Sequence, residues 1–490
     1  MIILSRKKYD EIENRLQQVL TQNQKLQEEI DQLKKAIEHK EALLVESRKK
    51  YKIIDGICLS EEQSAVVDML NNTDKCYFVT GKAGTGKSTV LKYFMANTGK
   101  KVVALAPTGI AANAIKGRTI HSFFGLRTGF QDAGDKDIVN RKINADSKLI
   151  EELDSIIIDE ASMIRADVMD MIDRKLQAAR NNKKPYGGIQ IILFGDLFQL
   201  PPVVTKIGNE AEILMRKYST PFFFGAPAAK QFIVCGLQEI FRQKDDRFIK
   251  VLNDIRFGRA TKAVLDELYA LCGKNTADTG NDMYIVPTND QADQINEERL
   301  SLIKSEEYTY YGFSDGDATE ADVPVSGKIT LKVGAPVMLL CNDTDGNFVN
   351  GTLAEVVELD HDVIRVCIDG KRIISVDKHT WEKYDYVYNE EEDKVETKQS
   401  GSFTQYPLKL AYAITVHKSQ GQTLDHITID YKKAGAFAPG QTYVALSRCR
   451  KPENIHLTVP IQAQDIQVSQ EVIAYMRKNH KPALQCVQEQ

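Results

Sequence analysis

The sequence predicts an α/β protein with parallel β-sheets, a small β-rich insertion and a separate helix at its N-terminus. Short apolar runs of β-branched and aromatic residues alternate with helix-compatible sequence from about residue 76 onward. This is the pattern of a parallel sheet with helices on both faces. Between residues 303 and 404 the apolar residues instead recur with period two, as they do in strands that pair in a β-rich unit. Residues 1–52 contain neither Gly nor Pro, so we expect a continuous helix ahead of the globular part.

The N-terminal segment carries apolar residues at the alternating three- and four-residue spacing of a coiled-coil seam. These residues are Ile12, Leu16, Val19, Leu26, Ile30, Leu33, Ile37 and Leu44. Asn23 falls on the seam, where a buried amide pairs best with its twin on a parallel partner, whereas Lys40 weakens the seam. The alternative is a lone helix packed on the globular body. We expect residues 1–54 to form a coiled-coil helix, with a homodimer through residues 12–44.

Length and composition limit the class of protein. The chain has 490 residues, enough for a few domains of ~100–200 residues each. Its 64 basic and 68 acidic residues give a net charge of −4, so a nucleic-acid partner requires a local basic channel. No apolar stretch reaches the ~18 residues of a membrane span, and the start of the chain becomes charged too early for a signal peptide. The eight cysteines form no CxxC pair, which argues against a zinc site. We expect a cytoplasmic protein with reduced cysteines and no membrane partner, associated with the nucleoid if it is bacterial.

The globular part begins at about Asp55. The spacing of its apolar residues changes along the chain and divides it into regions. A second α/β region begins near Tyr284 and resumes by Leu410, after the β-rich segment. Parallel strands end at one edge of a sheet, so polar residues that follow them come together there. The strands expected in the first region are residues 76–80, 101–106, 155–158 and 189–194.

A glycine-rich loop follows the first of these strands and opens a helix. Its glycines let backbone N–H groups curl around a phosphate without Cβ clashes, and the helix N-terminus adds partial positive charge. Lys87 would reach the β- and γ-phosphates of a nucleotide, and Ser88 would hold Mg²⁺. A simple Gly-rich turn is the alternative. The ATP-binding residues expected in this loop are Gly81, Ala83, Gly84, Thr85, Gly86, Lys87, Ser88 and Thr89.

Later strands are followed by side chains suited to nucleotide hydrolysis. Asp159 would hold the metal through water, and Glu160 would orient and activate the attacking water. Without the phosphate loop, the same two acids could be a turn or a helix cap. Gln199 can sense whether a γ-phosphate is present. Arg242 and Arg448 are candidate arginine fingers, although either alone could be a surface ion-pair residue.

The order of these motifs resembles that of superfamily-1 helicases of the RecD-like, 5′→3′ branch. Within that branch, the stretch from Asp159 through Arg180 is similar to the signature of the PIF (petite integration frequency) helicases. Together the motifs span residues 59–450. Besides the phosphate loop, the blocks that carry the resemblance are Leu59–Gln63, Ala106–Ala112, Thr119–Phe123, Asp159–Glu160, Gly195–Pro202, His417–Thr423 and Tyr443–Arg448.

The resemblance implies two RecA-like P-loop domains with ATP in the cleft between them, so that cleft closure completes the ATPase site. By position in its motif, Gln63 would read the adenine edge. A small wedge insertion at about residues 126–150 and an SH3-like β-barrel inserted into the second domain are implied as well. The expected boundaries are 1–54 for the helix, 55–225 for the first RecA-like domain, 226–302 and 405–490 for the second, and 303–404 for the barrel.

The resemblance also implies a path for DNA across both domains. Hydroxyl groups and a lysine suit phosphate oxygens, and contacts to the backbone predict little sequence preference. Phe123 could stack on a base or belong to the core. The residues expected to bind DNA are Thr108, His121, Ser122, Phe123, Thr415, His417, Lys418 and Ser419.

The function expected from the resemblance is an ATP-dependent DNA helicase that moves 5′→3′ on single-stranded DNA and unwinds duplex or forked DNA, with ATP and Mg²⁺ as cofactors. One alternative is a coiled-coil scaffold or nucleotide switch in which hydrolysis only times assembly. Another is a DNA translocase without strong unwinding activity.

Overall fold

The computed structural model of the 490-residue chain describes most of the globular part. The described residues are 15, 17, 21, 22, 24–27, 30, 34, 35, 56, 58–126, 129, 130, 132–139, 143, 147–204, 210–243, 245–272, 283–341, 343, 347, 348, 352–368, 370–389 and 394–489.

The first lobe of the molecule is built on a seven-stranded sheet in which every pair of neighbouring strands is parallel. The four strands expected here match four strands of this sheet, with ends that differ by at most one residue, so the prediction of a parallel α/β sheet is confirmed. In spatial order the strands are β21 (His480–Pro482), β6 (Ile233–Leu237), β1 (Tyr77–Gly81), β5 (Gln190–Gly195), β4 (Ser155–Ile158), β2 (Val102–Ala106) and β3 (Arg118–Thr119).

Helices cover both faces of this sheet, because successive side chains of a strand point to opposite faces. Tyr77 and Val79 of β1 belong to one buried cluster, whereas Phe78 belongs to the other. The first lobe also holds α4 (Gly109–Ala114), α6 (Lys136–Val139) and α9 (Glu210–Tyr218). The first face packs against α2 (Glu61–Asn72), α3 (Lys87–Asn97) and α16 (Ala483–Gln488), and the second against α5 (Ile120–Phe124), α7 (Ser147–Glu152), α8 (Ala166–Ala179) and α15 (Gln470–Asn479).

Two strands of the first sheet come from sequence that we expected in the second domain. β6 pairs with β1, and β21 pairs with β6, so residues 233–237 and 480–482 return to the first lobe. Both are short strands at one side of the sheet. Nothing in their sequences indicates which strand each of them pairs with. The boundary drawn at residue 225 therefore differs from the structure, since the chain crosses to the second lobe only after β6.

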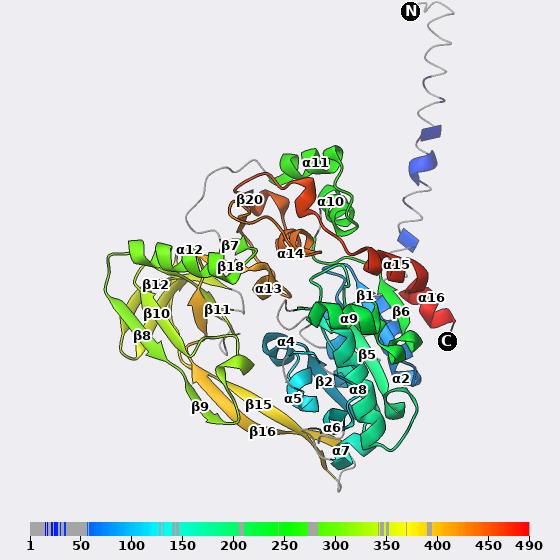
Figure 1. The fold of residues 1–490 in the computed structure, drawn as a ribbon. Helices are drawn as coiled ribbons and strands as arrows, with labels where there is room; N and C mark the ends of the chain where they lie inside the picture. Colours follow the sequence, from blue (N-terminus) through cyan, green and yellow to red (C-terminus); the bar gives the residue numbers. More distant parts are fainter. Residues whose placement is uncertain are drawn as a thin grey trace, which may run out of the picture.

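The second lobe contains a four-stranded parallel sheet and its own buried core. Figure 1 shows it above the first lobe. Its strands, in spatial order, are β18 (Ala413–Thr415), β7 (Met283–Val286), β19 (Ile427–Ile429) and β20 (Ile455–Leu457). Its helices are α10 (Asp246–Arg256), α11 (Lys262–Cys272), α12 (Asn289–Leu302), α13 (Val416–Ser419) and α14 (Gln441–Ser447).

The β-rich insertion forms a third unit, at the left of Figure 1, with antiparallel pairing throughout. Its long hairpin of β15 and β16 reaches down to the first lobe, where β15 contacts α7 and β3. Its strands are β8 (Glu307–Tyr311), β9 (Phe313–Gly316), β10 (Lys328–Lys332), β11 (Pro336–Leu339), β12 (Leu353–Asp360), β13 (Val363–Ile368), β14 (Arg372–Ser375), β15 (His379–Asn389), β16 (Lys394–Gln405) and β17 (Leu408–Leu410).

Little of the expected coiled coil falls within the described residues. Of the seam, Leu26 and Ile30 are described; both are helical, with 49% and 44% of their surface exposed. The other seam residues and the boundary at residue 54 lie outside the described part. The eight cysteines, all of which lie within the described residues, form no disulfide bond. Within the described residues, no helix combines the length and the apolar character needed to traverse a lipid bilayer.

Candidate ATPase site and DNA-facing surface

The phosphate loop joins β1 to α3 and places Lys87 at the first residue of the helix. Gly86, the residue that caps α3, has φ of 77°, in the left-handed region that favours glycine. The Lys87 ammonium donates to the carbonyl oxygens of Gly81 at 2.8 Å and Lys82 at 3.1 Å. Burial lowers the pKa of Lys87, although the nearby carboxylates of Asp196 and Glu160 oppose this effect. The lysine is therefore held within the loop that would surround a phosphate.

The two carboxylates at the end of β4 face the same space. Burial and the adjacent Glu160 raise the pKa of Asp159 to about 7. Glu160 has φ of 50°, a conformation that is uncommon for a residue with a side chain, and its Oε2 atom accepts a hydrogen bond of 2.8 Å from Gln420. The same Gln420 amide lies 3.3 Å from Oε1 of Gln199. A second-lobe glutamine thus joins two predicted catalytic residues of the first lobe.

Both predicted arginine fingers, Arg242 and Arg448, follow β6 in the chain and line the same space. Arg448 is 1% exposed, and its guanidinium donates to carbonyl oxygens of Val444, Ser419 and Gln422 at 2.8–3.3 Å. Burial, together with the positive charge of Arg242, lowers the pKa of Arg448 to about 10. No carboxylate pairs with either arginine among the described residues, so their charges remain available to an anion.

One cavity of about 920 Å³ collects these groups from both lobes. All five predicted catalytic residues line it, as do both predicted metal ligands and most of the phosphate loop. The lining residues predicted from the sequence are Ala83, Gly84, Gly86, Lys87, Ser88, Thr89, Asp159, Glu160, Gln199, Arg242 and Arg448.

Three predicted ATP-binding residues are absent from this lining. Gln63 forms the capping box of α2 with Ser60, and its amide donates to the carbonyl oxygen of Thr85 at 3.2 Å. It therefore braces the phosphate loop, and its contact with adenine stays a prediction. Thr85 is 1% exposed and donates to the Lys82 carbonyl oxygen, and Gly81 faces a different cavity.

A buried network that the sequence did not reveal connects the phosphate loop to the second lobe. Asp196, at the end of β5, forms a two-point ion pair with Arg256 of α10, at 2.7 and 3.2 Å. The Tyr443 hydroxyl of α14 accepts the backbone N–H of Ala83 at 2.9 Å and lies 3.5 Å from Asp196. A Cβ atom on Gly440 would lie 2.4 Å from the Gln199 carbonyl oxygen, so this glycine permits the close approach of α14.

The chain matches known proteins over most of its length. The family model of the PIF1-like helicases matches residues 58–265. The ATP-dependent DNA helicase Pif1 of Bdellovibrio bacteriovorus is 34% identical over 82% of this chain and 88% of its own length. The chain belongs to the PIF1-like helicase family. The mouse ATP-dependent DNA helicase PIF1 is also 34% identical, over 81% of this chain and 60% of the mouse protein.

Solved structures of PIF1-like helicases support the same assignment. The crystal structure of a Bacteroides Pif1 with ADP-AlF4 is 38% identical over 86% of this chain and 97% of that chain, with a TM-score of 0.77. A Bacteroides Pif1 bound to single-stranded DNA is 37% identical at the same coverage, but its TM-score is 0.62.

The ligands expected for Mg²⁺ in this PIF1-like helicase fit a hard cation. Ser88 and Asp159 supply oxygen atoms, the donor type that Mg²⁺ prefers. The carboxylate of Asp159, which lines the cavity and whose pKa burial raises, is a group whose charge a cation would stabilise. No cluster of three or more His, Cys, Asp or Glu side chains occurs in the described part of the chain.

The predicted DNA contacts divide by exposure. The side chains of Thr108, His121, Ser122 and His417 are half-buried and that of Lys418 is exposed. Figure 1 shows α4 and α5 on the side of the first lobe that faces the β-rich insertion, and α13 at the underside of the second lobe. Thr108, His121 and Ser122 therefore belong to the first lobe and His417 and Lys418 to the second, and Ser122 lines a small cavity together with Asp322 and Trp381 of the β-rich insertion.

The other three residues predicted to contact DNA are buried, so a contact from their side chains stays a prediction that this arrangement does not support. Phe123 is 0% exposed and packs edge-to-face on Phe124, with ring centres 5.0 Å apart, so it belongs to the core. The Thr415 hydroxyl caps α13 by accepting the Lys418 N–H, and the Ser419 hydroxyl donates to the Val416 carbonyl oxygen. Both hydroxyls are thus used within the second lobe to shape the turn that presents Lys418.

Proposed function

We propose that this PIF1-like helicase is an ATP-dependent DNA helicase that moves 5′→3′ along single-stranded DNA and unwinds duplex or forked DNA. The observation that carries the proposal is the 920 Å³ cavity, which Lys87 lines from one lobe and Arg448 from the other. A site divided in this way is complete only at one relative position of the lobes. Hydrolysis is therefore coupled to lobe motion, which is what a motor requires.

Each lobe contributes a separate part of the chemistry. The phosphate-loop N–H groups and Lys87 hold the β- and γ-phosphates, and Glu160 orients the water that attacks the γ-phosphate. Arg242 and Arg448 stabilise the negative charge that develops on the transferred phosphoryl group. Mg²⁺ bound by Ser88 and Asp159 would neutralise phosphate charge. Gln420 donates a hydrogen bond to Glu160, so a γ-phosphate that displaces this amide would signal to the second lobe.

The difference between the two Bacteroides comparisons supports lobe motion. Identity and coverage are nearly equal, yet the TM-score is 0.77 for the protein with ADP-AlF4 and 0.62 for the one with single-stranded DNA. We infer that this chain resembles the DNA-free arrangement and that its lobes reorient on DNA. Thr108 and Lys418, on the two sides of the lobe boundary, would then hold successive phosphates of one strand.

The remaining units have proposed roles in this motor. We assign the two lobes as RecA-like domains and the inserted β-region as an SH3-like barrel, and residues 126–150 as the wedge. The contact of β15 with α7 supports a joint wedge and barrel surface at the duplex junction. The exposed Leu26 and Ile30 support a homodimer through residues 12–44. Light scattering should show a dimer that the double substitution Leu26→Asp, Ile30→Asp converts to monomer.

A strand-separation assay tests direction and activity together. Duplexes with a 5′ tail should be unwound with ATP, and matched duplexes with a 3′ tail should not. Unwinding of the 3′-tailed duplex alone would reverse the direction. ATP hydrolysis without separation of either duplex would support a translocase that lacks unwinding power.

The scaffold alternative is separated from the motor by one exposed lysine. Lys418→Ala should lower the DNA-stimulated ATPase rate and spare the basal rate. The Lys418 ammonium is proposed to contact a phosphate of the DNA, and it does not line the ATPase cavity. The matched control is Lys478→Ala, which removes an exposed charge from α15. If both variants retain full stimulation by DNA, the motor loses its proposed strand contact and the scaffold is favoured.

A further inference from the structure

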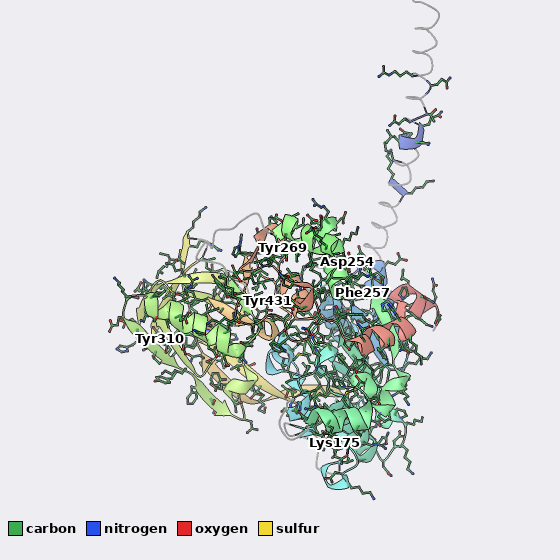
Figure 2. The ribbon with its side chains drawn as sticks, turned by 45° about the horizontal axis from the view of Figure 1, so that its top comes forward. Lys175, Asp254, Phe257, Tyr269, Tyr310 and Tyr431 are labelled. Carbon is green, nitrogen blue, oxygen red and sulfur yellow. The ribbon has the colours of Figure 1, made fainter. Side chains whose placement is uncertain are left out.

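A second cavity, of about 510 Å³, lies against the part of the phosphate loop that does not face the ATPase site. Gly81 and Lys82 line it, whereas the loop from Ala83 onward lines the 920 Å³ cavity. The remaining walls come from the end of α10, from α15 and from the end of β6. Figure 2 shows the labelled Phe257, one of its lining residues, next to the C-terminal helices. The phosphate loop is thus a wall shared by two cavities.

The second cavity is strongly basic. Lys82, Arg256, Arg259 and Arg477 line it together with His480, whose pKa is lowered by burial, and none of its described lining residues is acidic. Two of the cations have carboxylate partners outside the lining, since Arg256 pairs with Asp196 and Arg259 with Asp254. Lys82 and Arg477 have none among the described residues. Burial, and after it the charge of Arg256, lower the pKa of Lys82, whereas the carboxylate of Asp196 opposes this effect.

A buried polar group and an apolar wall complete the cavity. Thr80 lines it and is 0% exposed, yet the Thr80 hydroxyl has no hydrogen-bond partner. A buried hydroxyl without a hydrogen-bond partner costs stability. A ligand that forms a hydrogen bond with the Thr80 hydroxyl would therefore bind more tightly. Phe198, Phe257 and Met476 supply flat and apolar surface on the same cavity. The lining therefore offers positive charge, a hydroxyl and an aromatic wall in one space.

We infer that this cavity binds a free nucleotide, with its phosphates on Lys82 and Arg477 and its base against the aromatic wall. The site is distinct from the ATPase site and goes beyond the helicase function proposed above. Its ligand would contact Gly81 and Lys82, whose carbonyl oxygens hold the Lys87 ammonium. Occupation of the second cavity would thereby alter the position of Lys87 and regulate ATP hydrolysis.

The test uses the full chain with the ATPase site already filled. Guanosine diphosphate is titrated by calorimetry into protein saturated with Mg²⁺ and a non-hydrolysable ATP analogue. One equivalent should bind, with an affinity that does not change when the analogue concentration is raised tenfold. Arg477→Ser should weaken this binding about tenfold, as expected for the loss of one charge-assisted phosphate contact. Lys478→Ser removes the neighbouring exposed charge, which does not line the cavity, and should leave the affinity unchanged.

A second variant tests the interior of the cavity. Thr80→Val keeps the shape of the side chain and removes a hydroxyl that bonds to nothing, so it should weaken guanosine diphosphate without lowering the melting temperature. The inference is overturned if wild-type protein releases no heat, if Arg477→Ser and Lys478→Ser bind alike, or if added analogue competes. Displacement by a single-stranded oligonucleotide would also overturn it and assign the cavity to the DNA path. These measurements require no turnover, so they fail or succeed independently of the helicase assays.

Discussion

Replacing Arg256 tests whether the lobes are joined by the buried ion pair with Asp196. Arg256→Met removes the guanidinium and keeps an apolar side chain against Phe198, over which the guanidinium lies at 4.2 Å. The side chains of Arg256 and Asp196 are 6% and 0% exposed. The variant therefore leaves the buried Asp196 carboxylate without its ion-pair partner, and the donors that remain are the backbone N–H of Phe198 at 3.2 Å and the Tyr443 hydroxyl at 3.5 Å.

The magnitude follows from burial. Breaking one side of a buried ion pair costs about 3–5 kcal/mol, whereas an exposed pair contributes about 0.2–1 kcal/mol. The same helix supplies the control, since Arg247 pairs with Glu267 at 2.6 Å with side chains 65% and 35% exposed. At about 2–4 °C per kcal/mol for a domain of this size, Arg256→Met should lower the melting temperature by about 6–20 °C. Arg247→Met should lower it by less than about 4 °C.

The assay is thermal unfolding of the full chain in the absence of nucleotide, followed by circular dichroism. The double variant Arg256→Met, Asp196→Asn removes the buried charge as well and should recover most of the lost stability. Equal shifts for the two arginine variants would refute the reasoning. A double variant no more stable than Arg256→Met would also refute it, because the loss would then come from packing and not from charge.

Three further predictions concern the site and its surroundings. Lys87→Ala should abolish ATPase and unwinding while the melting temperature stays unchanged, since the ammonium bonds only loop carbonyl oxygens at the cavity wall. Arg242→Ala should retain ATP binding in a filter assay and slow hydrolysis by about 10³–10⁵. Burial and the nearby Lys418 lower the pKa of Lys409 to about 8, against about 10.4 in an unfolded chain. The native state then holds fewer protons between these values, so the free energy of unfolding should rise with pH from about 8 to about 10.4. Lys409→Met should flatten this rise in urea unfolding across pH.

The positions of residues that directly follow a strand of the first sheet could be predicted from the sequence. The phosphate loop, Asp159 and Glu160 each follow a short β-branched strand, and local geometry alone brings them to one edge of the sheet. The lengths of these strands were predicted well because their side chains are buried on both faces, which produces continuous apolar runs. The place of β6 and β21 was not predicted, because pairing with β1 depends on strand order and not on composition.

The residues that the sequence did not reveal act between the lobes. Tyr443 accepts the N–H of Ala83 across 360 residues of chain, and Gln420 donates to Glu160 across 260. Neither side chain differs in type from ordinary core or turn residues, so only the relative position of the lobes gives it a partner. The sequence offered one indication that Gln420 lies at the site: it belongs to the same motif, His417–Thr423, as Lys418. Because Gln420 bonds the carboxylate that orients water, any shift of the second lobe changes the orientation of Glu160. We therefore expect the ATPase rate of this protein to depend on lobe position, and the proposed binding of DNA at the lobe boundary would act through that dependence.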